Sequence, residues 1–189
     1  MRWERLFADL SAELDASTAA ELESELAERV RSERSKLRLV DRLRGSVDLR
    51  LDVHVLGVGV VSGTLLGVGP DWCLLQSGNG VERAGDHVVR LGAVLEVGGL
   101  AGFSAAPGSE GVVAARFSLA AVIRHLARDR AVVGVIRTDG RIVTGTVELS
   151  GADFLEMTER RADEPGWARG SGGPVRRTIP IAAVAAIRQ

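Results

Sequence analysis

The feature that most constrains this chain is an internal repeat over its second, longer part. Residues 60–65 (VVSGTL) align with residues 142–147 (IVTGTV), and residues 69–72 (GPDW) align with residues 151–154 (GADF), both at an offset of 82. Further on the offset becomes 90, so a later loop of the second copy holds eight extra residues. Agreement of apolar pattern, glycine and turn over segments of about 50 residues indicates duplication of one supersecondary unit.

Each copy is expected to form five short strands, because runs of β-branched residues alternate with glycine-containing turns. Gly63 and Gly145 lie within the second strand of their copies, and a glycine there predicts a sharp bend or a close backbone approach. A bent second strand lets a five-stranded sheet curl into a small barrel. Asp71 and Asp153 fall in the following turn, where we expect each aspartate to cap its own backbone.

Before the repeat, apolar residues at three- and four-residue spacing predict two amphipathic helices. The pattern breaks at residues 15–18, and Thr18 with Glu21 has the spacing of a capping box that would open the second helix. That helix carries an apolar stripe from Leu22 to Leu43. A short helix between the two copies is expected to begin at a capping Ser118.

Together these patterns predict an α+β protein in which N-terminal amphipathic helices precede two tandem five-stranded small β-barrels with a short linking helix. The expected parts are a helical arm (1–45), a first barrel (46–100), a linker with the short helix (101–130) and a second barrel (131–189).

The residues of the second copy resemble the Sm-like fold. Val133-x-Val135, the segment 138–141 (TDGR), the segment 144–147 (TGTV) and a closing Ile-Pro-Ile at 179–181 carry this resemblance. It implies a bent antiparallel barrel and RNA binding, and other SH3-like barrels fit the same pattern. The whole chain also resembles uncharacterised actinobacterial proteins, some of which are labelled Fis-type transcriptional regulators, although no helix-turn-helix pattern ends this chain.

The RNA contacts of the Sm-like family do not carry over to this sequence. Where that family has an acidic residue and later a base-contacting asparagine, this chain has Gly151 and Leu155 in the second copy, and Gly69 and Cys73 in the first. The family's Arg-Gly signature before the last strand is missing from both copies. The resemblance therefore implies a fold for residues 47–189 and leaves the ligand open.

No constellation of catalytic or metal-binding residues stands out. Cys73 is the only cysteine, and no carboxylate or cysteine lies at ligand spacing from His54, His87 or His125, so we expect these histidines to be structural. Neither phosphate-binding glycine motif occurs in the sequence. We therefore expect a protein that is not an enzyme and uses no cofactor or metal. The absence of an export signal or an apolar span predicts a cytoplasmic location with no membrane contact.

With a net charge of −1, any binding to nucleic acid must come from local basic patches. Two such patches are the end of the long helix and an arginine-rich loop from Arg160 to Arg177, and basic residues interleaved with an aromatic suit single-stranded nucleic acid. The candidate contacts are Arg31, Arg34, Lys36, Arg38, Arg160, Arg161, Trp167, Arg169, Arg176 and Arg177. The leading hypothesis is an RNA- or transcription-linked regulator or adaptor that contacts RNA or DNA.

The rival hypothesis is a protein-binding scaffold that uses the apolar stripe from Leu22 to Leu43 and binds no nucleic acid. The resemblance to Sm-like proteins, which usually form rings, also bears on the oligomeric state. A chain with two tandem barrels already contains one pairing of barrels, so a homodimer is expected in preference to a closed ring of six or seven members.

Overall fold

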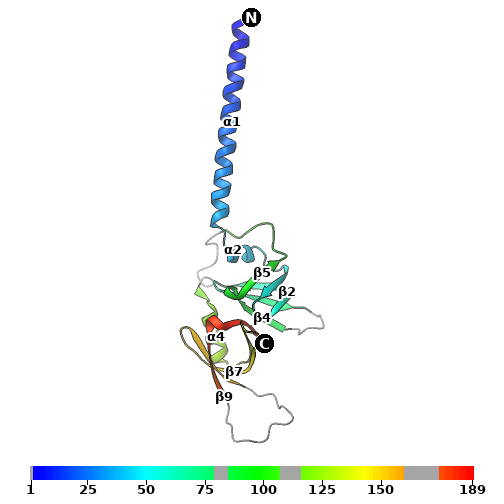
Figure 1. Cartoon of the computed structure of the whole chain (residues 1–189), viewed down its shortest axis with the longest axis vertical. Helices are drawn as coiled ribbons and strands as arrows, with labels where there is room; N and C mark the ends of the chain where they lie inside the picture. Colours follow the sequence, from blue (N-terminus) through cyan, green and yellow to red (C-terminus); the bar gives the residue numbers. More distant parts are fainter. Residues whose placement is uncertain (1, 79–84, 107–115, 160–174) are drawn as a thin grey trace. The chain divides into compact units, whose positions relative to one another are not determined.

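A computed structural model describes residues 2–78, 85–106, 116–159 and 175–189. The chain divides into two compact units, residues 1–38 and residues 39–189. The first unit is built around a single helix, α1 (Arg2–Lys36). Within the described residues, the second contains all the strands and two further helices, α2 (Leu39–Arg44) and α4 (Leu119–Arg128) (Figure 1).

The predicted interruption of the N-terminal helix at residues 15–18 is wrong. α1 runs through this segment without a break, and Thr18 lies inside it as an exposed residue. A small polar residue in a helix interior costs at most about 0.7 kcal/mol relative to alanine, whereas starting a new helix requires a fresh and unfavourable nucleus. The chain leaves the helix only after Lys36, and α2 begins at Leu39.

The strands of the two copies correspond one to one. The first copy contains β1 (Arg50–Val55), β2 (Gly59–Val68), β3 (Trp72–Ser77), β4 (Gly85–Arg90), a 3-10 turn η1 (Leu91–Ala93) and β5 (Val94–Gly98). The second contains β6 (Val132–Arg137), β7 (Ile142–Ser150), β8 (Phe154–Glu159), β9 (Val175–Pro180), η2 (Ile181–Ala183) and β10 (Val184–Arg188).

The strand registers also correspond between the copies. Gly63 pairs with Leu51, and Gly145 pairs with Val133, at the same offset of 82. The register of β2 against β3 shifts after Leu65, and that of β7 against β8 shifts at the equivalent Val147. Such shared irregularities follow from an equal arrangement of glycines and turns in the two copies.

Gly63 and Gly145 mark close backbone approaches, one of the two outcomes expected for them. A Cβ atom at Gly63 would lie 2.5 Å from the Gln76 carbonyl oxygen, and one at Gly145 would overlap the Thr158 carbonyl oxygen. In both copies, the second strand therefore passes so close to the third at this position that only glycine fits.

The ten strands form one antiparallel sheet in the order β5-β1-β2-β3-β4-β10-β6-β7-β8-β9. The expectation of two closed barrels is therefore not met, because the sheet is open within the described residues. In neither copy does the fourth strand pair with the fifth; instead β4 of the first copy pairs with β10 of the second. We call this β4–β10 pairing the seam. It satisfies the backbone hydrogen-bonding groups on the free edge of β4 with a strand from the other copy, which removes the need for closure.

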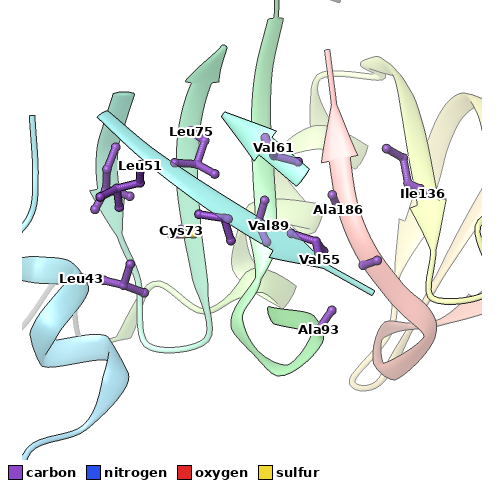
Figure 2. Packing of buried hydrophobic residues seen from close by; sticks show 13 residues of the cluster. Leu43, Leu51, Val55, Val61, Cys73, Leu75, Val89, Ala93, Ile136 and Ala186 are labelled. Carbon is purple, nitrogen blue, oxygen red and sulfur yellow. The ribbon is translucent and has the colours of Figure 1, made fainter. Parts of the chain in front are cut away.

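Side chains from both copies share one core at the seam. The first core cluster contains Leu43 of α2 and buried residues of β1 to β4, together with Ile136, Ala185 and Ala186 of the second copy. Figure 2 shows Ala186 and Ile136 on the strands that continue this sheet beyond Val89. The second cluster is covered by α4, which packs on β7 through Leu119 and Ile123.

Candidate functional site

The basic end of α1 is exposed and partly engaged in local contacts. Arg31, Arg34 and Lys36 in the last turns of α1, and Arg38 just beyond it, all have exposed side chains. The Arg31 Nε donates to the Ala27 carbonyl oxygen at 3.3 Å, and the Lys36 Nζ lies 2.7 Å from Glu33 Oε1. Exposed pairs of this kind contribute little stability, so these side chains can exchange their local partners for a ligand.

The predicted apolar stripe from Leu22 to Leu43 is divided between two environments. Leu22, Leu26 and Val30 on α1 are 56%, 60% and 48% exposed, and we call these three residues the α1 stripe. Leu43 on α2 is instead buried in the first core. The stripe was predicted as one continuous surface, and the division arises because the chain leaves the helical path between Lys36 and Leu39.

Arg176 and Arg177 lie on a strand, which corrects their placement in the arginine-rich loop. Both belong to β9, and the Nε of Arg177 lies 2.9 Å from the Oε2 of Glu159 on the neighbouring strand β8. The loop is shorter than predicted because β9 pairs with β8 from Val175 onward. Arg160, Arg161, Trp167 and Arg169 lie outside the described residues.

The turn that follows the second strand has different roles in the two copies. The carboxylate of Asp71 accepts a hydrogen bond from the backbone N–H of Leu119 at 2.8 Å, so it caps the first turn of α4. The side chain of Ser118, which was expected to cap this helix, makes no capping hydrogen bond. Asp71 was expected to cap its own turn, as was Asp153, whose side chain is exposed.

The neighbouring Trp72 strengthens the attachment of α4. Its indole N–H donates a hydrogen bond to the Phe117 carbonyl oxygen at 2.6 Å. The centroids of the Trp72 and Phe117 rings lie 6.3 Å apart in an edge-to-face arrangement. Since Trp72 also packs against the second core, this turn of the first copy helps to hold the linking helix that covers that core. The sequence predicted a purely local turn because nothing in its pattern indicates a partner 48 residues away.

A cavity of about 410 Å³ lies beside the seam. It is lined by Gly85, His87, Val132, Val133, Gly134, Thr144, Arg188 and Gln189. His87 is 8% exposed, and its buried Nδ1 has no hydrogen-bond partner among the described residues. Burial, assisted by the positive charge of Arg188 and opposed by Asp86, lowers the pKa of His87 below its usual 6.5.

Among the described residues, the cavity is lined by one imidazole, one guanidinium, one hydroxyl and one side-chain amide, and by no carboxylate side chain. It therefore provides no pair of titratable groups for acid-base chemistry. His87 was expected to be structural, and Arg188 was not singled out from the sequence. Their proximity was not predictable from the repeat, because the residue equivalent to His87 in the second copy is Arg177.

Cys73 lies in the first core, and burial raises the pKa of its thiol to about 12, so the nucleophilic thiolate is suppressed. Within the described part of the chain, no three or more His, Cys, Asp or Glu side chains are grouped so that they could hold a metal ion. No described helix is both long enough and apolar enough to cross a membrane.

Comparisons with protein-family models, curated proteins and solved structures gave no match.

Proposed function

We propose that this chain is a non-enzymatic adaptor that binds a partner protein through helix α1, with the ten-stranded sheet as its folded scaffold. The exposure of the α1 stripe is the observation that supports this most. Leu22, Leu26 and Val30 are about half exposed on a helix that belongs to a unit of its own. A helix in water gains most of its stability by packing an apolar face, so such a stripe suits a surface that is covered on binding.

The charges beside the α1 stripe favour a particular kind of partner. Between Arg29 and Arg38 the chain carries five basic residues and one acidic residue, Glu33. A partner helix with acidic residues flanking its own apolar stripe would pair favourably with this end. Burial of the three apolar side chains would then supply much of the affinity, at about 1 kcal/mol or more for each half-exposed residue.

The test compares proteins retained from a cell lysate by the full chain and by the triple variant Leu22→Gln, Leu26→Gln, Val30→Gln. The matched control is Leu149→Gln, because Leu149 has a similar exposure of 48% but lies on the sheet. We expect specific partners that stay bound at high salt, persist with the control and are lost with the triple variant. Equal retention by the triple variant and the wild type would contradict the proposal.

A second candidate function is binding of RNA or DNA, and the excess of basic residues at the end of α1 favours it. Replacing Arg31, Arg34, Lys36 and Arg38 together with glutamine should then weaken binding of a single-stranded oligonucleotide. The slope of log affinity against log salt should flatten by about 0.7 for each phosphate that the variant no longer neutralises. If the wild-type chain binds no oligonucleotide at about 50 mM salt, where attraction to phosphate is strong, this function is wrong.

A further inference from the structure

Four residues form one row across the strands at the seam. His87 on β4 pairs with Arg188 on β10, and Gly134 on β6 pairs with Arg188 from the other side. Gly134 pairs in turn with Thr144 on β7. Directly paired residues of neighbouring strands lie on the same face of a sheet, so this row shares one face. All four residues line the cavity beside the seam.

Two nitrogen-bearing side chains of this row lack a partner among the described residues. His87 is 8% exposed, and its Nδ1 is buried without a hydrogen bond. The half-buried side chain of Arg188 makes no hydrogen bond or ion pair with any described residue. By contrast, the guanidinium of Arg90 on β4 donates to the carbonyl oxygens of Val184, at 2.6 Å, and Ala182, at 2.9 Å. Because buried polar groups in proteins are normally hydrogen-bonded, the row presents groups that a ligand can satisfy.

Gly134 gives the side chain of Arg188 its place in the cavity. A Cβ atom at Gly134 would lie 2.9 Å from the Nε and 3.1 Å from the Cγ of Arg188. Glycine therefore lets the stem of the arginine lie against the backbone of β6. In the first copy Asp52 takes the place of Gly134, and Gly98 takes the place of Arg188. The row thus belongs to the seam and is not a feature of the repeated unit.

We propose that this cavity binds a small organic carboxylate, whose negative charge is held by the guanidinium of Arg188. A guanidinium and a carboxylate form charge-assisted hydrogen bonds, often two in parallel. The Thr144 hydroxyl and the His87 imidazole supply further hydrogen-bonding groups, and Val132 supplies an apolar wall for a short hydrocarbon group. The volume of about 410 Å³ lies within the range of about 300–1,000 Å³ that is usual for small-molecule sites.

The charges around the row favour a ligand with a single negative charge. Arg188 supplies one positive charge, whereas His87 is neutral at neutral pH because its pKa is lowered below 6.5. Asp86 also acts on His87, but it is exposed, and the alternation of side chains along β4 places it on the opposite face. A carboxylate therefore matches the cavity better than a phosphate ester, which carries a charge of about −1.5 to −2 at neutral pH.

The experiment titrates the isotope-labelled full-length chain with isobutyrate and follows the backbone amides by nuclear magnetic resonance. The matched probe is isobutyramide, which has nearly the same shape and no charge, and methyl phosphate is the third probe. We expect isobutyrate to cause saturable shifts centred on the amides of His87, Gly134, Thr144 and Arg188. Isobutyramide should cause no saturable shift there, and methyl phosphate should bind more weakly than isobutyrate. The proposal is overturned if isobutyrate gives no saturable shift at these amides, or if either of the other probes binds as tightly.

A pair of arginine variants tests the role of Arg188. Arg188→Gln should weaken the binding of isobutyrate by about tenfold or more, because the charge-assisted hydrogen bonds are lost. The control is Arg141→Gln, which removes the same charge from an exposed position in the turn between β6 and β7 and should leave the affinity unchanged. Equal affinities of these two variants for isobutyrate would overturn the proposal.

Gly134→Ala tests the geometry of the site without any change of charge. The added Cβ should displace the side chain of Arg188, which is flexible, so we expect a folded protein with weakened binding of isobutyrate. Wild-type affinity in this variant would contradict the site. The triple α1-stripe variant should bind isobutyrate as the wild type does, which separates this site from the partner surface proposed on α1.

Discussion

Gly145 lies where β7 passes directly against the backbone of β8. A side chain at this position would overlap the carbonyl group of Thr158. Because that neighbour is backbone and belongs to a paired strand, it cannot move aside as the end of a flexible side chain would. The strand must shift instead, with loss of hydrogen bonds in the ladder.

We therefore expect Gly145→Val to lower the free energy of unfolding by about 1 to 3 kcal/mol or more. The matched control is Gly67→Ala on β2, because a Cβ there meets no atom within 4 Å. Denaturant unfolding followed by circular dichroism measures both. Equal unfolding midpoints for Gly145→Val and the wild type would contradict this prediction, because they would mean that the backbone of β8 moves to accommodate the side chain.

His87 couples the stability of the unit formed by residues 39–189, which we call the sheet unit, to pH. Its pKa in the folded chain lies below the unfolded value near 6.5, so the unfolded chain binds the proton more tightly. The stabilising effect of the neutral imidazole is fully present above about pH 6.5 and is lost as the pH falls through the lower, folded pKa.

We expect His87→Gln to reduce the loss of stability between neutral pH and about pH 5. His54→Gln should leave this loss unchanged, since His54 is exposed on β1. Thermal unfolding in a series of buffers measures both variants. The same pH dependence in His87→Gln and the wild type would assign it to other groups.

At the scale of elements, α4 depends on a cap from a distant turn. Asp71 accepts the hydrogen bond from the backbone N–H of Leu119, and its negative charge lies near the positive end of the helix dipole. The equivalent Asp153 is exposed, and no helix of the described residues begins beside it.

Asp71→Ala should therefore lower the free energy of unfolding by about 0.5 to 2 kcal/mol, as the loss of a helix cap does. Asp153→Ala, the matched change in the other copy, should cost less than about 0.5 kcal/mol. Urea denaturation measures the difference, and hydrogen exchange of the first amides of α4 locates it. Equal costs for the two variants would mean that Asp71 stabilises only its own turn.

At the scale of the whole molecule, the chain divides into two compact units that are stabilised in different ways. α1 relies on its own backbone hydrogen bonds, whereas the sheet unit has two buried cores and the seam. The side chain of Glu25 is exposed near the middle of the described part of α1.

Glu25→Pro should break α1, because proline removes a backbone donor and clashes with the preceding turn at a cost of about 3 kcal/mol. We expect the helical circular dichroism signal to fall while hydrogen-exchange protection of residues 39–189 stays as in the wild type. Glu25→Ala is the control and should preserve the helix. A loss of protection in the sheet unit would reveal coupling between the two units.

The local patterns of the sequence were sufficient to predict the elements of each copy. The spacing of apolar residues, the mid-strand glycines Gly63 and Gly145 and the turns at Asp71 and Asp153 depend on residues close in the chain. The repeat then supplied the correspondence of strands, because equal patterns form equal pairings.

Tertiary structure alone decided how the copies meet and what several polar side chains do. A strand edge carries no sequence mark of its partner, so the pairing of β4 with β10, and with it the single open sheet, was not predictable. The same holds for the cap that Asp71 gives to α4 and for the burial of His87 beside Arg188. Each depends on residues far apart in the chain, whose proximity follows from packing and not from local pattern.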